Sequence, residues 1–258
     1  MAWSASRYTI FENERTRPVR DLLAAVPTRH PARLADLGCG PGNSTEVLRT
    51  RYPDACITAI DSSGEMLTAA RARLPEVDFQ QTDIAVWQPE APLDLILANA
   101  SLQWVPDHAA LFPRLAGFLA PGGSLAIQMP DNQDDPFKTL MRETATDPRW
   151  SDRIGHERST RFADHPVPWY YDLLSASCGT VNIWRTRYWH VLPDGVDGIV
   201  AWFKGSALRP FLAALDEAEQ ALFLAQYRDA LVRAYPVQAD GSVLLPMPRL
   251  FLVATRQG

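Results

Sequence analysis

The first half of the chain alternates apolar segments with amphipathic ones, and this alternation limits the possible folds more than any other feature. Segments typical of strands lie at 33–39, 56–61, 77–83, 93–99 and 124–129. Helix-like segments lie between most of them, and such an alternation predicts a parallel sheet with helices on both faces. Because crossovers between parallel strands are right-handed, the predicted architecture is a doubly wound α/β fold.

The second half of the chain carries fewer strands and more helix. The range 180–192 alternates with a period of two and predicts a long strand, the range 196–234 is strongly helical, and the range 243–255 predicts a last strand. We therefore expect a seven-stranded, mostly parallel sheet with a helical cap inserted before its last strand. The predicted parts are an N-terminal segment (1–30), an α/β core (31–130), the rest of the core with an irregular insertion (131–195), the cap (196–235) and a C-terminal strand (236–258).

Composition excludes several classes of function. The 258 residues include 25 Lys and Arg against 30 Asp and Glu, and a net charge of −5 argues against nucleic-acid or anionic-membrane partners. No apolar run reaches the roughly 18 residues that span a bilayer, and the N-terminal residues lack a signal core, so we expect a cytoplasmic protein. The three cysteines form no CxxC pair, which argues against a disulfide framework or a zinc site.

A glycine-rich segment follows the first predicted strand and opens a helix. Residues 36–42 read Asp-Leu-Gly-Cys-Gly-Pro-Gly. Glycines permit positive φ and close approach to a ligand, and the N-terminus of the helix offers free N–H groups to an anion. The dinucleotide fingerprint G-x-G-x-x-G fails here, because its third glycine is replaced by Asn43 in one frame and by Thr45 in the other. A nicotinamide-dependent oxidoreductase is therefore disfavoured.

Polar residues follow three further predicted strands. Asp61 ends the second strand, Asp83 ends the third and is followed by Ile84, and Asn99 ends the fourth. Asp61 lies 23 positions after Gly38 (61 − 38), close to the ~20 expected of an acid that binds ribose hydroxyls. Each residue alone could cap a turn or a helix, but strand ends of a parallel sheet meet at one edge. Together they predict a nucleoside site there.

These motifs resemble class I S-adenosylmethionine-dependent methyltransferases. The resemblance rests on D-L-G-C-G-P-G, the acid after the second strand, Asp-Ile after the third, and L-x-P-G-G before the fifth, within residues 34–130. A fuller pattern runs along nearly the entire chain and is similar to members of that family that methylate a small polycarboxylic acid, trans-aconitate. It consists of the segments MAWSASRYTIFENERTRPVRDLL, NASLQWVPDH, QMPDN, NIWRT and LPMPRLF.

The resemblance implies S-adenosyl-L-methionine as the cofactor, S-adenosyl-L-homocysteine as a product, and a role for each motif residue. The glycines would let the loop pass under the methionine moiety and ribose, while Asp36 would hold the loop and the methionine amino group. Asp61 would bind the ribose hydroxyls, Asp83 and Ile84 the adenine edge, and Asn99 the methionine portion near the sulfonium. The predicted cofactor-binding residues are Asp36, Gly38, Gly40, Gly42, Asp61, Ser62, Asp83, Ile84 and Asn99.

A carboxylate acceptor changes what the protein must provide. A carboxylate with a pKa of about 4 is already ionised at neutral pH, so we propose no general base, and we expect His108 on a helix surface. The remaining carboxylates of a tricarboxylate would be clamped by arginine. The candidate arginines are Arg17, Arg153, Arg158, Arg161, Arg185, Arg187 and Arg209, with Arg17 and Arg209 preferred. The candidate pocket walls are Tyr8, Trp104, Trp169 and Tyr170, of which the last two are more typical of a core.

Other functions remain open from the sequence alone. A methyltransferase acting on a hydroxyl or an amine shares the motifs but usually needs a base near the methyl group, and none is evident between Asn99 and Trp104. A cofactor-binding protein without transferase activity would carry the same binding residues. An RNA methyltransferase is disfavoured by the acidic balance. We expect no metal, and a monomer or a weak homo-oligomer.

Overall fold

The computed structural model describes residues 12–156 and 165–258. It divides into two compact units. The first comprises Met1–Pro130, Ala163–Thr186 and Arg249–Gly258, and the second Asp131–Phe162 and Arg187–Pro248. Among the described residues, no helix is both long and apolar enough to cross a bilayer.

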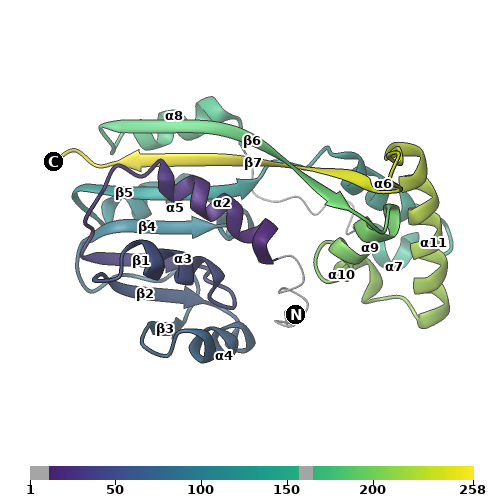
Figure 1. Cartoon of the computed structure of the whole chain (residues 1–258), viewed down its shortest axis with the longest axis horizontal. Helices are drawn as coiled ribbons and strands as arrows, with labels where there is room; N and C mark the ends of the chain where they lie inside the picture. Colours follow the sequence, from purple (N-terminus) through teal and green to yellow (C-terminus); the bar gives the residue numbers. More distant parts are fainter. Residues whose placement is uncertain (1–11, 157–164) are drawn as a thin grey trace. The chain divides into compact units, whose positions relative to one another are not determined.

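Seven strands form one sheet in the order β3-β2-β1-β4-β5-β7-β6 (Figure 1). The strands are β1 (Arg33–Leu37), β2 (Cys56–Asp61), β3 (Asp78–Gln81), β4 (Leu93–Asn99), β5 (Leu119–Pro130), β6 (Thr180–Leu192) and β7 (Val243–Thr255). Strands β1 to β5 pair in parallel, and β7 runs antiparallel to β5. The order reverses between β1 and β4, where α/β sheets bind ligands. The predicted doubly wound fold is confirmed.

Helices cover both faces of the sheet in the first unit. These helices are α2 (Glu12–Ala24), α3 (Asn43–Arg51), α4 (Gly64–Arg73), the short η2 (Leu102–Trp104), α5 (His108–Gly117) and α8 (Val167–Ser175). On one face, Phe112 of α5 and Tyr170 of α8 join the apolar cluster that contains Ile96 and Ile127 of the sheet. Helix α2 contacts α3 and β5. Because side chains alternate along a strand, Leu95 and Leu97 point to the face opposite Ile96.

Three strands differ in length from the prediction, and one difference affects the site. Strand β1 ends at Leu37 instead of residue 39. Strand β3 ends at Gln81, so Asp83 follows the strand by two residues instead of ending it. Strand β5 begins at Leu119 instead of 124. The pairing with β4 is irregular between these positions, because the register shifts between the pairs that contain Leu119 and Ser124.

The second unit is mostly helical. Its helices are α6 (Pro136–Thr144), α7 (Ser151–Ile154), α9 (Val196–Lys204), α10 (Arg209–Leu212) and α11 (Glu217–Ala234). The rings of Phe137 and Phe203 stack with centroids 4.2 Å apart, and the Tyr227 hydroxyl donates to the Phe137 carbonyl at 2.9 Å. Asp216 and Glu219 form a capping box at the start of α11. The helices predicted within 196–234 are present, and their role as a cap stays a prediction.

Candidate functional site

Four polar side chains share one face of the sheet at or near the carboxyl ends of four neighbouring strands. Asn99 pairs in register with Gln128, and Asp36 pairs with the residues two positions before Asp61 and Asn99. Residues in register on parallel strands, and residues two apart along a strand, point to the same side of a sheet. The pleat therefore places Asp36, Asp61, Asn99 and Gln128 on the same face, which we call the strand-end face.

The loop after β1 needs glycine for two different reasons. Gly38 has a φ of +75°, and a Cβ built on it would lie 2.4 Å from the Cβ of Ser101. A side chain at Gly38 would therefore clash inside the protein. Gly40 has a φ of +55°, but nothing lies within 4 Å of a Cβ built on it. The backbone at Gly40 thus borders open space, as a close approach to a ligand requires.

Asp61 holds the glycine loop and the start of α4 together. Its Oδ2 accepts a hydrogen bond from the Gly40 N–H at 2.9 Å, and its Oδ1 accepts from the Ser63 N–H at 2.8 Å. Ser63 is the N-cap of α4, and the carbonyl of Ser62 accepts from Gln81 at 3.2 Å. Each carboxylate oxygen has two lone pairs, so Asp61 retains capacity to accept from a ligand.

Asp36 is a fully buried carboxyl group, and only one of its oxygens accepts hydrogen bonds from the described residues. Its Oδ2 accepts from the hydroxyls of Ser44 and Thr45, both at 2.7 Å. Its Oδ1 has no hydrogen-bond partner among the described residues. Burial raises the pKa of Asp36 to about 6, because desolvation outweighs the hydrogen bonds from Thr45 and Ser44, and the negative charge of Asp61 adds to the rise. The free oxygen suits a cationic donor.

Buried amide groups without partners surround the same strand ends. Among the described residues, no partner is found for either amide atom of Asn43, for Asn99 Oδ1, for Gln103 Oε1 or for Gln128 Nε2. The great majority of buried polar atoms in proteins are paired, so this group of unpaired atoms indicates a ligand site. Of these four residues, only Asn99 is among the cofactor-binding residues predicted from the sequence. The sequence feature that could have identified them is a polar side chain inside a motif segment, such as the glutamine that follows the apolar residues of β5.

The residues predicted to bind adenine lie just after β3. The carboxylate of Asp83 accepts from the Ala85 N–H at 2.8 Å and is exposed, whereas Ile84 is buried. The Ile84 carbonyl accepts from Arg114 at 2.5 Å, which fixes this loop to α5. The loop is therefore well ordered by its own contacts, with an acidic group on the surface beside a buried apolar one.

The predicted substrate residues are scattered through the chain. Tyr8 lies outside the described residues. Arg17 is exposed on α2 with its Nε 4.0 Å from a carboxylate oxygen of Asp21. Trp104 ends η2 with 54% of its surface exposed, and Arg209 begins α10 in the second unit. The clamp formed by Arg17 and Arg209 stays a prediction.

His108 is not on the surface, and that expectation is wrong. The side chain is 1% exposed, with Nδ1 2.9 Å from the Tyr170 hydroxyl and Nε2 2.9 Å from the Leu102 carbonyl. Both ring nitrogens are thus used within the core of the first unit. Tyr170 is itself fully buried, as a core residue, so this pair ties α5 to α8 and η2.

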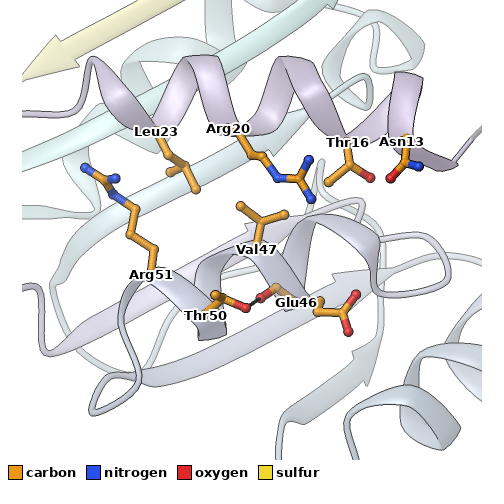
Figure 2. A pocket seen from close by; sticks show the side chains of 8 residues that line it. All are labelled: Asn13, Thr16, Arg20, Leu23, Glu46, Val47, Thr50 and Arg51. Atoms are coloured by element: carbon orange, nitrogen blue, oxygen red, sulfur yellow. Dashed lines mark hydrogen bonds between the residues drawn. The ribbon is translucent and has the colours of Figure 1, made fainter.

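A hollow of about 660 Å³ lies between α2 and α3 (Figure 2). It is lined by Asn13, Thr16, Arg20, Leu23, Glu46, Val47, Thr50 and Arg51. None of the predicted cofactor or substrate residues lines it. We call this hollow the α2–α3 groove. Among the described residues, no three His, Cys, Asp or Glu side chains gather as metal ligands.

Comparison with known proteins identifies close relatives along the whole chain. A family model described as "Methyltransferase domain" matches residues 34–123. The chain is 55% identical to the trans-aconitate 2-methyltransferase of Methylobacterium nodulans over 254 residues, covering 98% of each chain. It is 48% identical to the enzyme of the same name from Variovorax paradoxus over 257 residues, covering 99% of this chain and 98% of the other.

Solved structures with much lower identity share the fold. The YcgJ protein of Bacillus subtilis matches 94% of this chain and 99% of its own, with a TM-score of 0.61 and 13% identity. A Haemonchus contortus phosphoethanolamine N-methyltransferase, solved with phosphomonomethylethanolamine and S-adenosylhomocysteine, matches 94% of this chain and 53% of its own, with a TM-score of 0.57 and 16% identity. These two similarities show only that the fold is shared.

Proposed function

Because the chain belongs to the trans-aconitate 2-methyltransferase family, we propose that it transfers a methyl group from S-adenosylmethionine to a carboxylate of trans-aconitate. The product is the monomethyl ester, with S-adenosylhomocysteine released. The observation that carries this proposal is 55% identity to a relative of that name over 98% of both chains. The strand-end face, with its open carboxylate and amide atoms, supports it from the structure.

The residues present fit this cofactor. The backbone at Gly40 borders open space, so a ligand can approach the loop closely. The unpaired Oδ1 of Asp36 would accept from the ammonium of the methionine moiety, and the spare lone pairs of Asp61 would accept from the ribose hydroxyls. Ser62, Asp83 and Ile84 would border the nucleoside, as their places after β2 and β3 suggest. We assign these roles as proposals.

The bound cofactor supplies a methyl group on a positively charged sulfur, and the protein supplies orientation and electrostatics. Asn99 Oδ1, an unpaired acceptor at the end of β4, would favour that positive charge. The acceptor carboxylate is ionised near neutral pH and needs no proton removed. His108 fits this assignment, because both of its nitrogens are occupied by core partners. Holding carboxylate and methyl group in line would supply several kcal/mol of the barrier reduction.

Selectivity for a polycarboxylate requires cations around the carboxylates that do not react. We propose Arg17 and Arg209 for this clamp and Tyr8 and Trp104 for the walls of the acceptor site. Arginine binds carboxylates through two parallel hydrogen bonds, which would fix the orientation of the acceptor. We further propose a cytoplasmic enzyme that acts as a monomer or a weak homo-oligomer, without nucleic-acid or membrane partners.

The proposed function is tested by methyl transfer from labelled S-adenosylmethionine to trans-aconitate, cis-aconitate, citrate and isocitrate, with a phenol and an amine as controls. We expect turnover with trans-aconitate to exceed that with the phenol and the amine by at least 100-fold. Cofactor binding without turnover on any acid would contradict the proposal that trans-aconitate is the methyl acceptor. Faster turnover on the amine or the phenol would place the protein in another class of methyltransferase.

A further inference from the structure

Two buried glutamines, one paired in register with Asn99 and the other four residues after it, take no part in the proposed cofactor site. Gln128 lies near the end of β5, is 1% exposed, and its Nε2 has no partner among the described residues. Gln103 lies in η2, is 5% exposed, and its Nε2 donates to the Ala100 carbonyl at 2.7 Å. That bond fixes the orientation of the Gln103 amide, so Oε1 is the atom left without a partner.

The buried, unpaired atoms near the ends of β4 and β5 are opposite in polarity. After β4, the atoms that are both buried and unpaired are two carbonyl oxygens, Asn99 Oδ1 and Gln103 Oε1, which favour a positive group. Near the end of β5 the atom that is both buried and unpaired is an N–H donor, Gln128 Nε2, which favours an anion. Asn99 and Gln128 are register partners on strands that lie about 4.8 Å apart. These two polarities match a cation beside an anion.

We propose that Gln128 positions the acceptor carboxylate and that Gln103 acts together with Asn99 on the positively charged cofactor. This inference rests on the proposed function, since a cationic methyl donor and an anionic acceptor are the pair that the two polarities match. A neutral amide also suits the positioning of the reacting carboxylate better than a cation does. It orients one carboxylate oxygen through a single hydrogen bond, and it withdraws less charge from the attacking oxygen than an arginine would.

The main test replaces Gln128 by glutamate, which keeps the shape and exchanges the donor for a negative charge. We expect Gln128→Glu to raise the KM for trans-aconitate at least tenfold at pH 8, with the Kd for S-adenosylhomocysteine within twofold of wild type. Activity should recover as the pH falls, because a protonated glutamate is again a donor. The matched control is Gln238→Glu, which adds the same charge at an exposed residue of the second unit and should change neither constant.

Gln103→Met gives the opposite pattern if the assignment is right. It should raise the Kd for S-adenosylmethionine several-fold, and more than the Kd for S-adenosylhomocysteine, whose sulfur is uncharged, with little change in the KM for trans-aconitate. If Gln128→Glu does not fold, Gln128→Met removes the donor without adding charge and should also raise the KM. A wild-type KM in a folded Gln128 variant would overturn the proposal, as would an equal loss of cofactor and acceptor binding.

Binding measurements separate this proposal from the proposed function. Calorimetric titration of trans-aconitate into the protein saturated with S-adenosylhomocysteine needs no turnover. Binding by the wild type that is weakened tenfold in Gln128→Glu supports the Gln128 assignment, even if the wild type fails to methylate trans-aconitate. Such a failure would contradict only the proposed function. Equal binding by wild type and variant would contradict only the Gln128 assignment.

Discussion

The α2–α3 groove and the strand-end face differ in what they offer to a ligand. The groove is a hollow of about 660 Å³ (Figure 2), yet none of the motif residues lines it. The strand-end face carries the motif residues and a set of buried polar atoms without partners. On our proposal, unmet hydrogen-bonding capacity is a better guide to the cofactor site than volume is, because an unpaired buried polar atom costs free energy until a ligand or water pairs with it.

Several polar side chains of the groove have partners within the protein. Thr50 donates to the Glu46 carbonyl at 2.8 Å, and the Glu46 carboxylate lies 2.9 Å from Arg73. Arg51 donates to the Tyr52 hydroxyl at 3.1 Å. In contrast, Asp36 keeps an unpaired oxygen in the core. A ligand in the groove would therefore compete with existing contacts, whereas a ligand on the strand-end face would complete missing ones.

The sharpest test compares two glycines of the same loop. Gly38→Ala should destabilise the fold by roughly 2–4 kcal/mol, because φ is positive and the added methyl group meets the Cβ of Ser101 at 2.4 Å. Gly40→Ala should cost only about 1 kcal/mol of stability, but should weaken S-adenosylmethionine binding at least tenfold, since its methyl group would occupy the open space. Denaturant unfolding and calorimetry measure the two effects. Unchanged affinity in Gly40→Ala would mean that the ligand lies elsewhere.

Asp36→Asn should change how the stability of the fold depends on pH. A carboxyl whose folded pKa is raised to about 6 makes the fold less stable as pH rises from about 4 to 6, because the folded state holds the proton longer than the unfolded state does. Without this charge, the variant should gain stability relative to wild type over that range and keep the gain above it. Thermal unfolding of both proteins between pH 4 and 8 gives this difference.

The same carboxylate should make cofactor binding depend on pH. If Asp36 is ionised against the methionine ammonium, wild-type affinity for S-adenosylmethionine should fall toward tenfold per pH unit below about pH 6. Asp36→Asn should bind more weakly at pH 8 and lose this dependence. Parallel pH profiles of Kd in the two proteins would exclude a direct role for Asp36.

The smallest effect is expected in the groove. Arg20→Ala removes an exposed cation that lines the groove, and should change stability by no more than about 0.5 kcal/mol. The affinities for cofactor and for trans-aconitate should stay within twofold of wild type. A tenfold loss of either affinity would show that the groove takes part in binding and would reverse the comparison between the two regions.

Local patterns in the sequence were enough to predict the fold and the backbone of the site. Alternating strands and helices are short-range signals, and the glycine loop and Asp61 lie directly after strands. The environment of His108 could not be predicted, because its partner Tyr170 is 62 residues away in the chain. Gln103 and Gln128 were missed for a related reason. The roles that we propose for them rest on atoms that stay unpaired after folding, and only the complete set of contacts reveals which atoms those are.

The most direct test is amide hydrogen exchange with and without S-adenosylhomocysteine. We expect the bound ligand to slow exchange in the glycine loop (38–42), at residues 61–63 after β2 and at residues 99–103 after β4. Amides that border the groove, at 16–23 of α2 and 47–51 of α3, should change little beyond any global stabilisation. Protection concentrated at the groove, with the strand ends unchanged, would contradict the assignment of the cofactor to the strand-end face.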